Sequence, residues 1–338
     1  MPPRLIFWIT LSSALLGALF GHAQALAQGG DAGGAGYWLG AVDGALIAGV
    51  LSSLEIVALS GAAGIRFRQM PFLIYLCLRS LIYLGVILIV LATGHWLMPI
   101  GDTRGFVVRR VEIAFSLGLA FGYNLLLGVN QLLGPGVLLA FVAGRYHRPR
   151  LEERVLLFID MRGSTAIAER LGEARFLDFL NRFITDVSLA IAETGGEIHK
   201  YVGDEVIATW APGAADAGAD SVRACFAALD RLAAHADAYE RDFGFRADFR
   251  VGLHYGPVVV GELGYLKKEI ALIGDTMNTA ARIQQACRDT GHRVLASAAL
   301  IERIAALPAG IACRALGPLA LRGKEHALEL FALEAAAR

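Results

Sequence analysis

The sequence has few of the residues that hold small secreted domains or zinc sites together. It contains four cysteines among 338 residues, and no two of them have the spacing of a CxxC motif. Scattered single cysteines argue against a disulfide framework or a zinc ribbon, and they favour free thiols in a reducing compartment. The four are Cys77, Cys225, Cys287 and Cys313.

The chain also lacks net charge, since 31 Lys and Arg are balanced by 31 Asp and Glu. No basic stretch is interleaved with aromatic residues, so nucleic acid is not an expected partner. The balance hides an asymmetry, because residues 1–150 carry 10 basic and 5 acidic residues, which leaves 21 basic and 26 acidic residues in the remainder. The composition therefore predicts a basic first half and a mildly acidic second half.

Hydrophobic residues make up 56% of the chain, and long apolar runs lie in the first half. Leu5–Gly21 follows Arg4 and precedes Ala23-Gln24-Ala25, a pattern that suits a signal peptide with a cleavage site. It suits a first transmembrane helix equally well. Residues 1–27 are therefore interpreted as one or the other.

Residues 28–130 contain three further apolar segments, at about 39–62, 72–97 and 111–129. Each is close to the roughly 20 residues that cross the hydrocarbon core of a bilayer. We expect residues 131–150 to form a short helix near the inner surface and a basic linker. Arginines between the first two segments and after the last one place both regions in the cytoplasm, because positive charge favours that side. This predicts a multi-pass protein of the cytoplasmic (inner) membrane whose helices anchor or sense, rather than transport.

Residues 151–338 alternate strand and helix patterns. A strand at 155–159 precedes a helix at 173–194, a hairpin at 197–210 and a helix at about 217–243, and a second strand pair is expected at 246–254 and 257–263. The order strand, helix, hairpin, helix, strand is that of an α+β, ferredoxin-like fold. In that topology the first strand and the hairpin are neighbours near the centre of the sheet.

Acidic residues stand where these strands end. Asp160 closes the strand at 155–159, and Asp204 occupies the turn of the hairpin. For an isolated Gly-Asp pair, the preference of Asp for turns explains its presence more simply than a metal site does. Two such acids at one edge of a sheet, however, suit a pair of Mg²⁺ or Mn²⁺ ions, which take oxygen ligands and bridge phosphates.

Three further stretches add phosphate chemistry. Gly163-Ser164-Thr165 opens a helix directly after Asp160, so its free backbone N–H groups can bind phosphate oxygens. Asn278 and Arg282 are four residues apart and share one face of a helix. An amide there can orient a ribose, a guanidinium can neutralise charge that develops on phosphorus, and Lys324 can bind terminal phosphates.

These motifs resemble the catalytic domain of the class III adenylate and guanylate cyclases, from about residue 153 to 333. Asp160 in FIDMRGST and Asp204 in KYVGDE match the two metal-binding acids of the family, and the backbone carbonyl of Met161 is implied as a further metal ligand. The run NTAAR, residues 278–282, matches the transition-state Asn and Arg. Lys324 in LRGKEH matches the phosphate-binding Lys.

The resemblance also bears on the choice of base. Lys200 matches the family Lys that accepts adenine, where guanylate cyclases typically carry Glu. The second base-recognising position holds Ala271, where adenylate cyclases usually have Asp or Thr. Recognition then falls to Lys200 alone, to the backbone or to nearby Glu269.

The resemblance implies an adenylate cyclase that converts ATP to cyclic AMP and pyrophosphate with two Mg²⁺ or Mn²⁺ ions per site. It also implies a homodimer, in which the Asp160 and Asp204 pair of one chain meets Asn278 and Arg282 of the other. The alternatives are a guanylate cyclase, or a weakly catalytic cyclase-like module that binds nucleotide for regulation. A cyclic-di-GMP synthase, suggested by Gly203-Asp204-Glu205, would leave Asn278 and Arg282 without a role.

Overall fold

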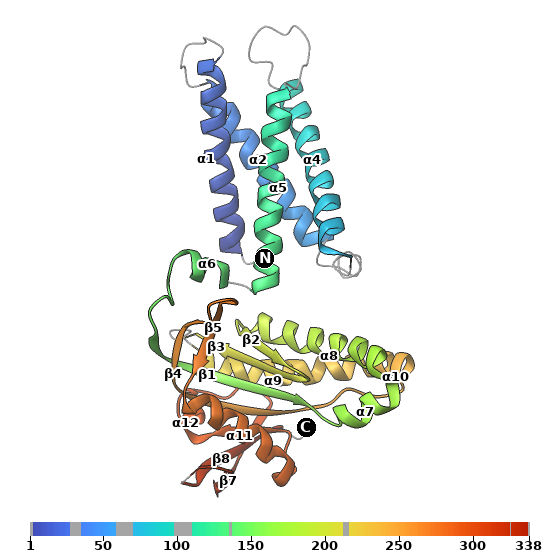
Figure 1. The fold of residues 1–338 in the computed structure, drawn as a ribbon, viewed down its shortest axis with the longest axis vertical. Helices are drawn as coiled ribbons and strands as arrows, with labels where there is room; N and C mark the ends of the chain where they lie inside the picture. Colours follow the sequence, from blue (N-terminus) through green and yellow to red (C-terminus); the bar gives the residue numbers. More distant parts are fainter. Residues whose placement is uncertain are drawn as a thin grey trace. The chain divides into compact units, whose positions relative to one another are not determined.

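The computed structural model describes residues 3–27, 35–58, 70–97, 110–134, 137–211, 216–324 and 326–336. The chain divides into two compact units, residues 1–133 and 134–338 (Figure 1). This division lies close to the boundary that composition and hydropathy predict.

The first unit is helical. It contains α1 (Pro3–Ala27), α2 (Ala35–Ala58), α4 (Phe72–Leu97) and α5 (Arg110–Leu133). These helices overlap the four predicted apolar segments, although α2 begins earlier than expected and the predicted end at residue 62 lies outside the described residues. Neighbours pack in the order α1 with α2, α2 with α4 and α4 with α5. A small core of Leu51, Tyr83, Ile87 and Ala120 joins the last three helices.

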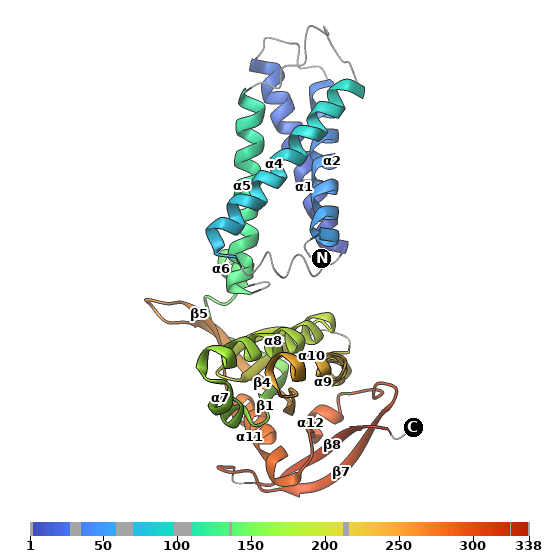
Figure 2. The ribbon, with the colours of Figure 1, turned by 90° about the vertical axis from the view of Figure 1, so that its right-hand side faces the viewer.

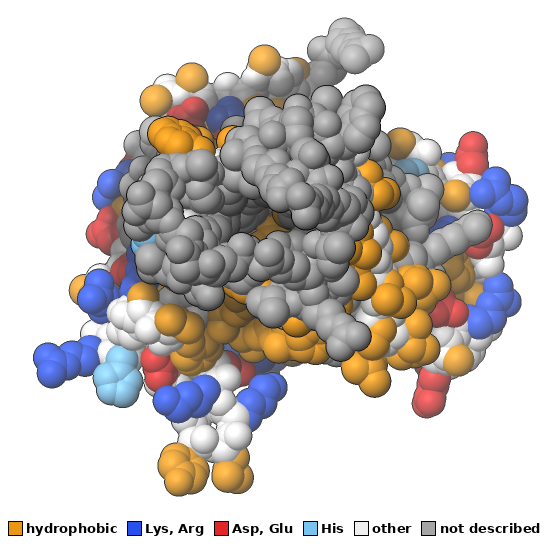
Figure 3. Space-filling model, turned by 90° about the horizontal axis from the view of Figure 1, so that it is seen from above, with side chains coloured by type: hydrophobic (Ala, Val, Ile, Leu, Met, Phe, Trp, Pro, Cys, Tyr) orange, Lys and Arg blue, Asp and Glu red, His pale blue; other side chains and the backbone are white. Residues whose placement is uncertain are grey.

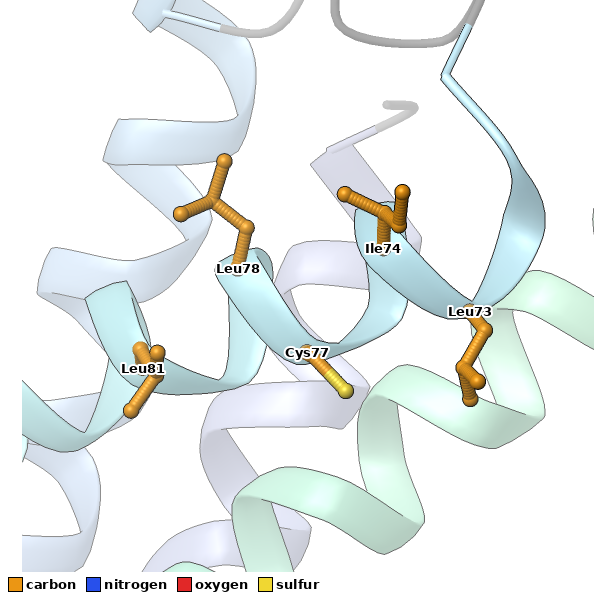
Figure 4. A pocket seen from close by; sticks show the side chains of 5 residues that line it. All are labelled: Leu73, Ile74, Cys77, Leu78 and Leu81. Atoms are coloured by element: carbon orange, nitrogen blue, oxygen red, sulfur yellow. The ribbon is translucent and has the colours of Figure 1, made fainter.

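Within the described part of the chain, one helical stretch, Leu73–Val90 on α4, has the length and apolar composition of a membrane span. Shorter apolar stretches occur at Thr10–Leu19 and Gly44–Leu54. Many aliphatic side chains of this unit are exposed, and hydrophobic side chains are conspicuous on the surface drawn in Figure 3. An open apolar pocket on α4 is lined by Leu73, Ile74, Cys77, Leu78 and Leu81 (Figure 4).

The second unit begins with the short helix α6 (Val137–Val142) and continues as an α+β domain. Its central elements are β1 (Arg150–Met161), α7 (Ser164–Leu171), α8 (Glu173–Glu193), β2 (Glu197–Val202), β3 (Glu205–Trp210), α9 (Ala217–Ala234), α10 (Ala236–Phe243) and β4 (Phe249–Leu263). The sheet order β2-β3-β1-β4 is antiparallel throughout, which confirms the ferredoxin-like arrangement. The predicted helix at 217–243 is interrupted at His235 between α9 and α10.

The remaining elements extend the sheet. They are β5 (Glu269–Ile273), α11 (Asp275–Thr290), β6 (Val294–Ser297), α12 (Ala298–Ile301), β7 (Ile311–Leu319) and β8 (Leu328–Ala335). The strand order continues from β4 through β6 and β8 to β7, while β5 pairs with β4. Helices α8 and α9 cover one face of the sheet, and α11 covers the other. Two hydrophobic cores therefore form on opposite faces of the sheet.

The predicted strand pair at 246–254 and 257–263 is wrong. Residues 249–263 form the single 15-residue strand β4, and the hairpin lies further on, between β4 and β5. The Pro257 carbonyl accepts a hydrogen bond from the Thr276 hydroxyl of α11, and neither β5 nor β6 pairs with β4 at this residue. Since N–H and C=O of one residue point to the same side in an antiparallel strand, its missing N–H falls where β4 has no strand neighbour.

Candidate active site

The two predicted metal ligands meet at one end of the sheet. Asp160 lies near the end of β1, and Asp204 follows Gly203 in the tight turn between β2 and β3. Gly203 has φ of 63°, a left-handed conformation that glycine adopts without strain. The register pairs Asp160 with Glu205, the first residue of β3, so the turn carries Asp204 to the end of β1. The sequence prediction of convergence is consistent with this placement.

Glu205, the register partner of Asp160, lies close enough to the two acids to be affected by their charges, a role that the sequence left open. Its pKa is raised to about 7, first by burial and then by the negative charges of Asp160 and Asp204. Burial is the main cause, and the further contribution of the two acids indicates negative charge concentrated at this end of the sheet. The arrangement therefore attracts cations.

A divalent cation fits the donors present, which are carboxylate oxygens of Asp160 and Asp204. No set of three His, Cys, Asp or Glu side chains converges as a ready-made metal site in the portion of the chain that is described. Further ligands would come from backbone, solvent or substrate. The side chain of Met161 is buried in the core, so this residue can contribute only its backbone.

Two arginines that the sequence analysis did not single out lie beside Asp160. Arg288, near the end of α11, places Nη2 3.2 Å from Oδ2 of Asp160. Arg250 on β4 is the register partner of Asp160 on the side opposite Glu205. The alternation of β4 and the helical spacing of α11 give no sign of these placements, because they depend on how the two elements pack against β1.

The start of α7 follows directly on this acidic end. Gly163 precedes the helix with φ of 71°, and the first helical hydrogen bond runs from the Ile167 N–H to the Gly163 carbonyl. The backbone N–H groups of Ser164 and Thr165 precede that bond and have no acceptor within the helix. They are therefore available to an anion.

Lys200 and Glu269 form an ion pair. The Lys200 Nζ lies 3.3 Å and 3.4 Å from the two carboxylate oxygens of Glu269. A bulge between Ile198 and Lys200 shifts the register of β2, so that Ile198 pairs with Ala208 of one core and Lys200 with Ile207 of the other. Ala271, which stands opposite Gly261 on β4, is buried.

Asn278 and Arg282 lie on α11, as predicted. Asn278 is exposed, and the Arg282 Nη1 donates to the Gln285 Oε1 at 2.8 Å. Because Arg288 of the same helix contacts Asp160, Asn278 is ten residues from that contact, roughly 15 Å along the helix axis. Within one chain, the acids and the Asn278 side chain are therefore held apart.

Lys324 lies at the other end of α11, where its Nζ donates to the carboxylate of Asp275. This bond is the main reason that the pKa of Asp275 is lowered. The buried His254 imidazole lies close by, with Nδ1 2.7 Å from the Ser297 hydroxyl, and its pKa is lowered to about 4, chiefly by burial and then by the charge of Lys324. The predicted phosphate-binding amine is thus held against the start of α11.

Residues 147–335 match the family model described as the adenylate and guanylate cyclase catalytic domain. Among curated proteins, Adenylate cyclase 2 of Rhizobium meliloti is 37% identical over 199 residues, which cover 59% of this chain and 54% of that protein. The chain thus spans about half the length of this relative, and it covers 36% of a second, the Adenylate cyclase of Anabaena cylindrica, at 27% identity.

Among solved structures, the adenylyl cyclase CyaB from P. aeruginosa aligns with a TM-score of 0.51 and 22% identity, covering 56% of this chain and 98% of that one. At this level of identity the structural likeness shows a shared fold and nothing more.

Proposed function

Because the chain belongs to the adenylate and guanylate cyclase catalytic-domain family, we propose that it is an adenylate cyclase that converts ATP to cyclic AMP and pyrophosphate. The observation that carries the proposal is the meeting of Asp160 and Asp204 at one end of the sheet, beside Glu205, whose pKa is raised by burial and then by their charges. The name of the similar Rhizobium meliloti protein supports ATP as the substrate.

In this proposal Asp160, Asp204 and the Met161 carbonyl hold two divalent ions, Mg²⁺ or Mn²⁺. Bound there, the ions would favour ionisation of the ribose 3′ hydroxyl and neutralise the triphosphate. The chain's own groups bind and orient the nucleotide. The N–H groups of Ser164 and Thr165, after the turn at Gly163, bind phosphate oxygens in the manner of a helix N-terminus.

The other predicted groups act on the reacting phosphate and its neighbours. The Asn278 amide would orient the ribose, and the Arg282 guanidinium would neutralise charge that grows on the α-phosphoryl oxygens. Lys324 would leave Asp275 to bind the terminal phosphates. The exchange is feasible because the Asp275 carboxylate is exposed to solvent. Lys200 would donate to the adenine ring.

We further propose that two chains form a homodimer with sites shared between them. The separation along α11 supports this, because one chain keeps Asn278 roughly 15 Å from the helix end that contacts Asp160. A second chain can supply Asn278 and Arg282 to the acids of the first, and the reciprocal contact gives two equivalent sites.

The helical unit is proposed to anchor the enzyme in the cytoplasmic membrane as a multi-pass bundle, with residues 131–150 as the juxtamembrane link and residues 151–338 as the catalytic domain in the cytoplasm. The lengths of α1, α2, α4 and α5 and the apolar stretch on α4 support this. Residues 1–27 are either the first helix of that bundle or a cleaved signal peptide.

The test is product formation by the full-length chain in detergent, supplied with Mn²⁺ and either ATP or GTP. We expect cyclic AMP from ATP, abolished in Asp204→Asn and retained in Asp242→Asn, a control acid of α10 that pairs with Arg182 away from the site. Cyclic GMP as the main product would make the chain a guanylate cyclase. Nucleotide binding without either product would contradict catalysis and favour the regulatory module.

A further inference from the structure

The β4–β5 hairpin presents one polar side chain at the place where Ala271 offers none. Along β5, Ile270 and Leu272 pack with Val258 and Val260 of the core on the α11 face of the sheet. Residues two apart in a strand share a side, so Glu269 and Ala271 lie together on the opposite side of β5. Figure 2 shows this hairpin projecting from the remainder of the second unit.

Glu269 faces Lys200 although 69 residues separate them in sequence. Both oxygens of its carboxylate lie within 3.4 Å of the Lys200 Nζ, and the side chains retain exposed fractions of 39% and 50%. The pair is therefore accessible to a ligand. The bulge in β2 turns Lys200 away from the side of Ile198, since a regular strand would place both residues on the same side.

Neighbouring charges leave this pair intact. The buried Arg154 guanidinium is already bonded to Glu152 and to the Tyr146 hydroxyl. The pKa of His199 is lowered, first by burial and then by the charge of Lys200, so its imidazole is neutral near pH 7 and does not compete for the Glu269 carboxylate.

We propose that Glu269 recognises the exocyclic amino group of adenine, beside Lys200, and so supplies the acceptor that is missing at Ala271. The proposal rests on the proposed function. Adenine presents a ring-nitrogen acceptor next to an amino donor, which match an ammonium and a carboxylate respectively. Guanine presents an N–H and a carbonyl oxygen in the same two places, so it would set donor against donor and acceptor against acceptor. Glu269 is thus a specificity-determining residue, and its side chain is one methylene longer than an Asp at position 271 would be.

The experiment removes the carboxylate and, separately, the amino group that it would bind. Full-length wild type, Glu269→Ala and Glu269→Ala/Ala271→Asp are compared with ATP, GTP and purine riboside triphosphate, which lacks the amino group. Glu240→Ala is the matched control, because it removes another exposed carboxylate that pairs with an arginine, Arg246. Selectivity is measured as kcat/KM and as competition against a fluorescent ATP analogue.

We expect Glu269→Ala to lower kcat/KM for ATP by about 10- to 100-fold, the range for a hydrogen bond to a charged group. It should leave purine riboside triphosphate unchanged and should not lower the value for GTP. Ala271→Asp in the same chain should restore the preference for ATP. Glu240→Ala should behave as wild type.

An equal loss for ATP and purine riboside triphosphate would overturn the proposal, since Glu269 would then act only by positioning Lys200. Unchanged selectivity in Glu269→Ala would overturn it too. Failure of the proposed function has a different signature, the absence of cyclic product from wild type with every nucleotide. The binding competition still decides the role of Glu269 in that event.

Discussion

Replacing Arg288 with Gln should tighten the binding of divalent metal. The Arg288 guanidinium occupies Oδ2 of Asp160 at 3.2 Å, and a metal ion needs lone pairs of the same carboxylate. The Gln side chain removes the charge and keeps most of the length. Since guanidinium and metal compete for one group, loss of the first should favour the second.

The size of the effect follows from the exposure of the pair. At a charge separation of about 4 Å the Coulomb energy is about 1 kcal/mol in water and about 4 kcal/mol at an effective dielectric constant of about 20. The Arg288 side chain is 63% exposed and that of Asp160 16%, so screening places the value near the lower end, at about 1 kcal/mol. That energy corresponds to roughly a fivefold change in affinity.

The assay is titration of the full-length protein with Mn²⁺, with free ion measured by electron paramagnetic resonance at low ionic strength. Arg231→Gln, which breaks the ion pair with Glu193 on α8, is the control and should leave the affinity unchanged. The gain in Arg288→Gln should shrink as salt is added, because salt screens an exposed pair. An affinity that is unchanged or weaker would refute competition and would mean that Arg288 orients Asp160 for the metal.

Two further predictions concern the packing of α11 and the pH dependence of stability. Gly252→Ala should lower the thermal midpoint of the second unit and reduce activity, because a Cβ at Gly252 would meet backbone atoms of α11 at 2.3 Å and 2.5 Å. A midpoint equal to that of wild type would contradict this and show that the helix can shift freely. For His254, the folded pKa of about 4 lies below the unfolded value of 6.5. Its contribution to the free energy of unfolding is therefore fully present above pH 6.5 and is lost as the pH falls through 4, a loss of at most about 3 kcal/mol. His254→Gln, which can keep the contact with Ser297 beside Lys324 and Asp275, should flatten the melting profile between pH 6.5 and 4, and an unchanged profile would contradict this origin.

Local patterns were sufficient to predict the acidic end of the sheet. The hairpin at 197–210 forms as expected because its turn residues and alternating apolar residues lie next to one another in sequence. Asp160 is reliably placed because a run of buried strand residues must end where it does. The ferredoxin-like order then brings the two acids together without any side-chain detail.

The parts that sequence reasoning missed depend on contacts between distant segments. Strand β4 continues through Pro257, whose carbonyl accepts a hydrogen bond from Thr276 of α11, and no local pattern reveals this contact. The contact of Arg288 with Asp160 spans 128 residues, and that of Lys200 with Glu269 depends on a bulge that shifts one strand by a residue. Such contacts follow from packing rather than from periodicity.

The measurement that tests the account most directly is complementation between two inactive chains. Asp204→Asn lacks a metal ligand, and Arg282→Ala lacks the guanidinium that the partner would supply. If sites are shared, equal co-expression gives half mixed dimers with one intact site of two, or about one quarter of wild-type cyclic AMP formation. Each variant alone should be inactive. An inactive mixture, with mixed dimers demonstrated by differential tags, would contradict the shared site.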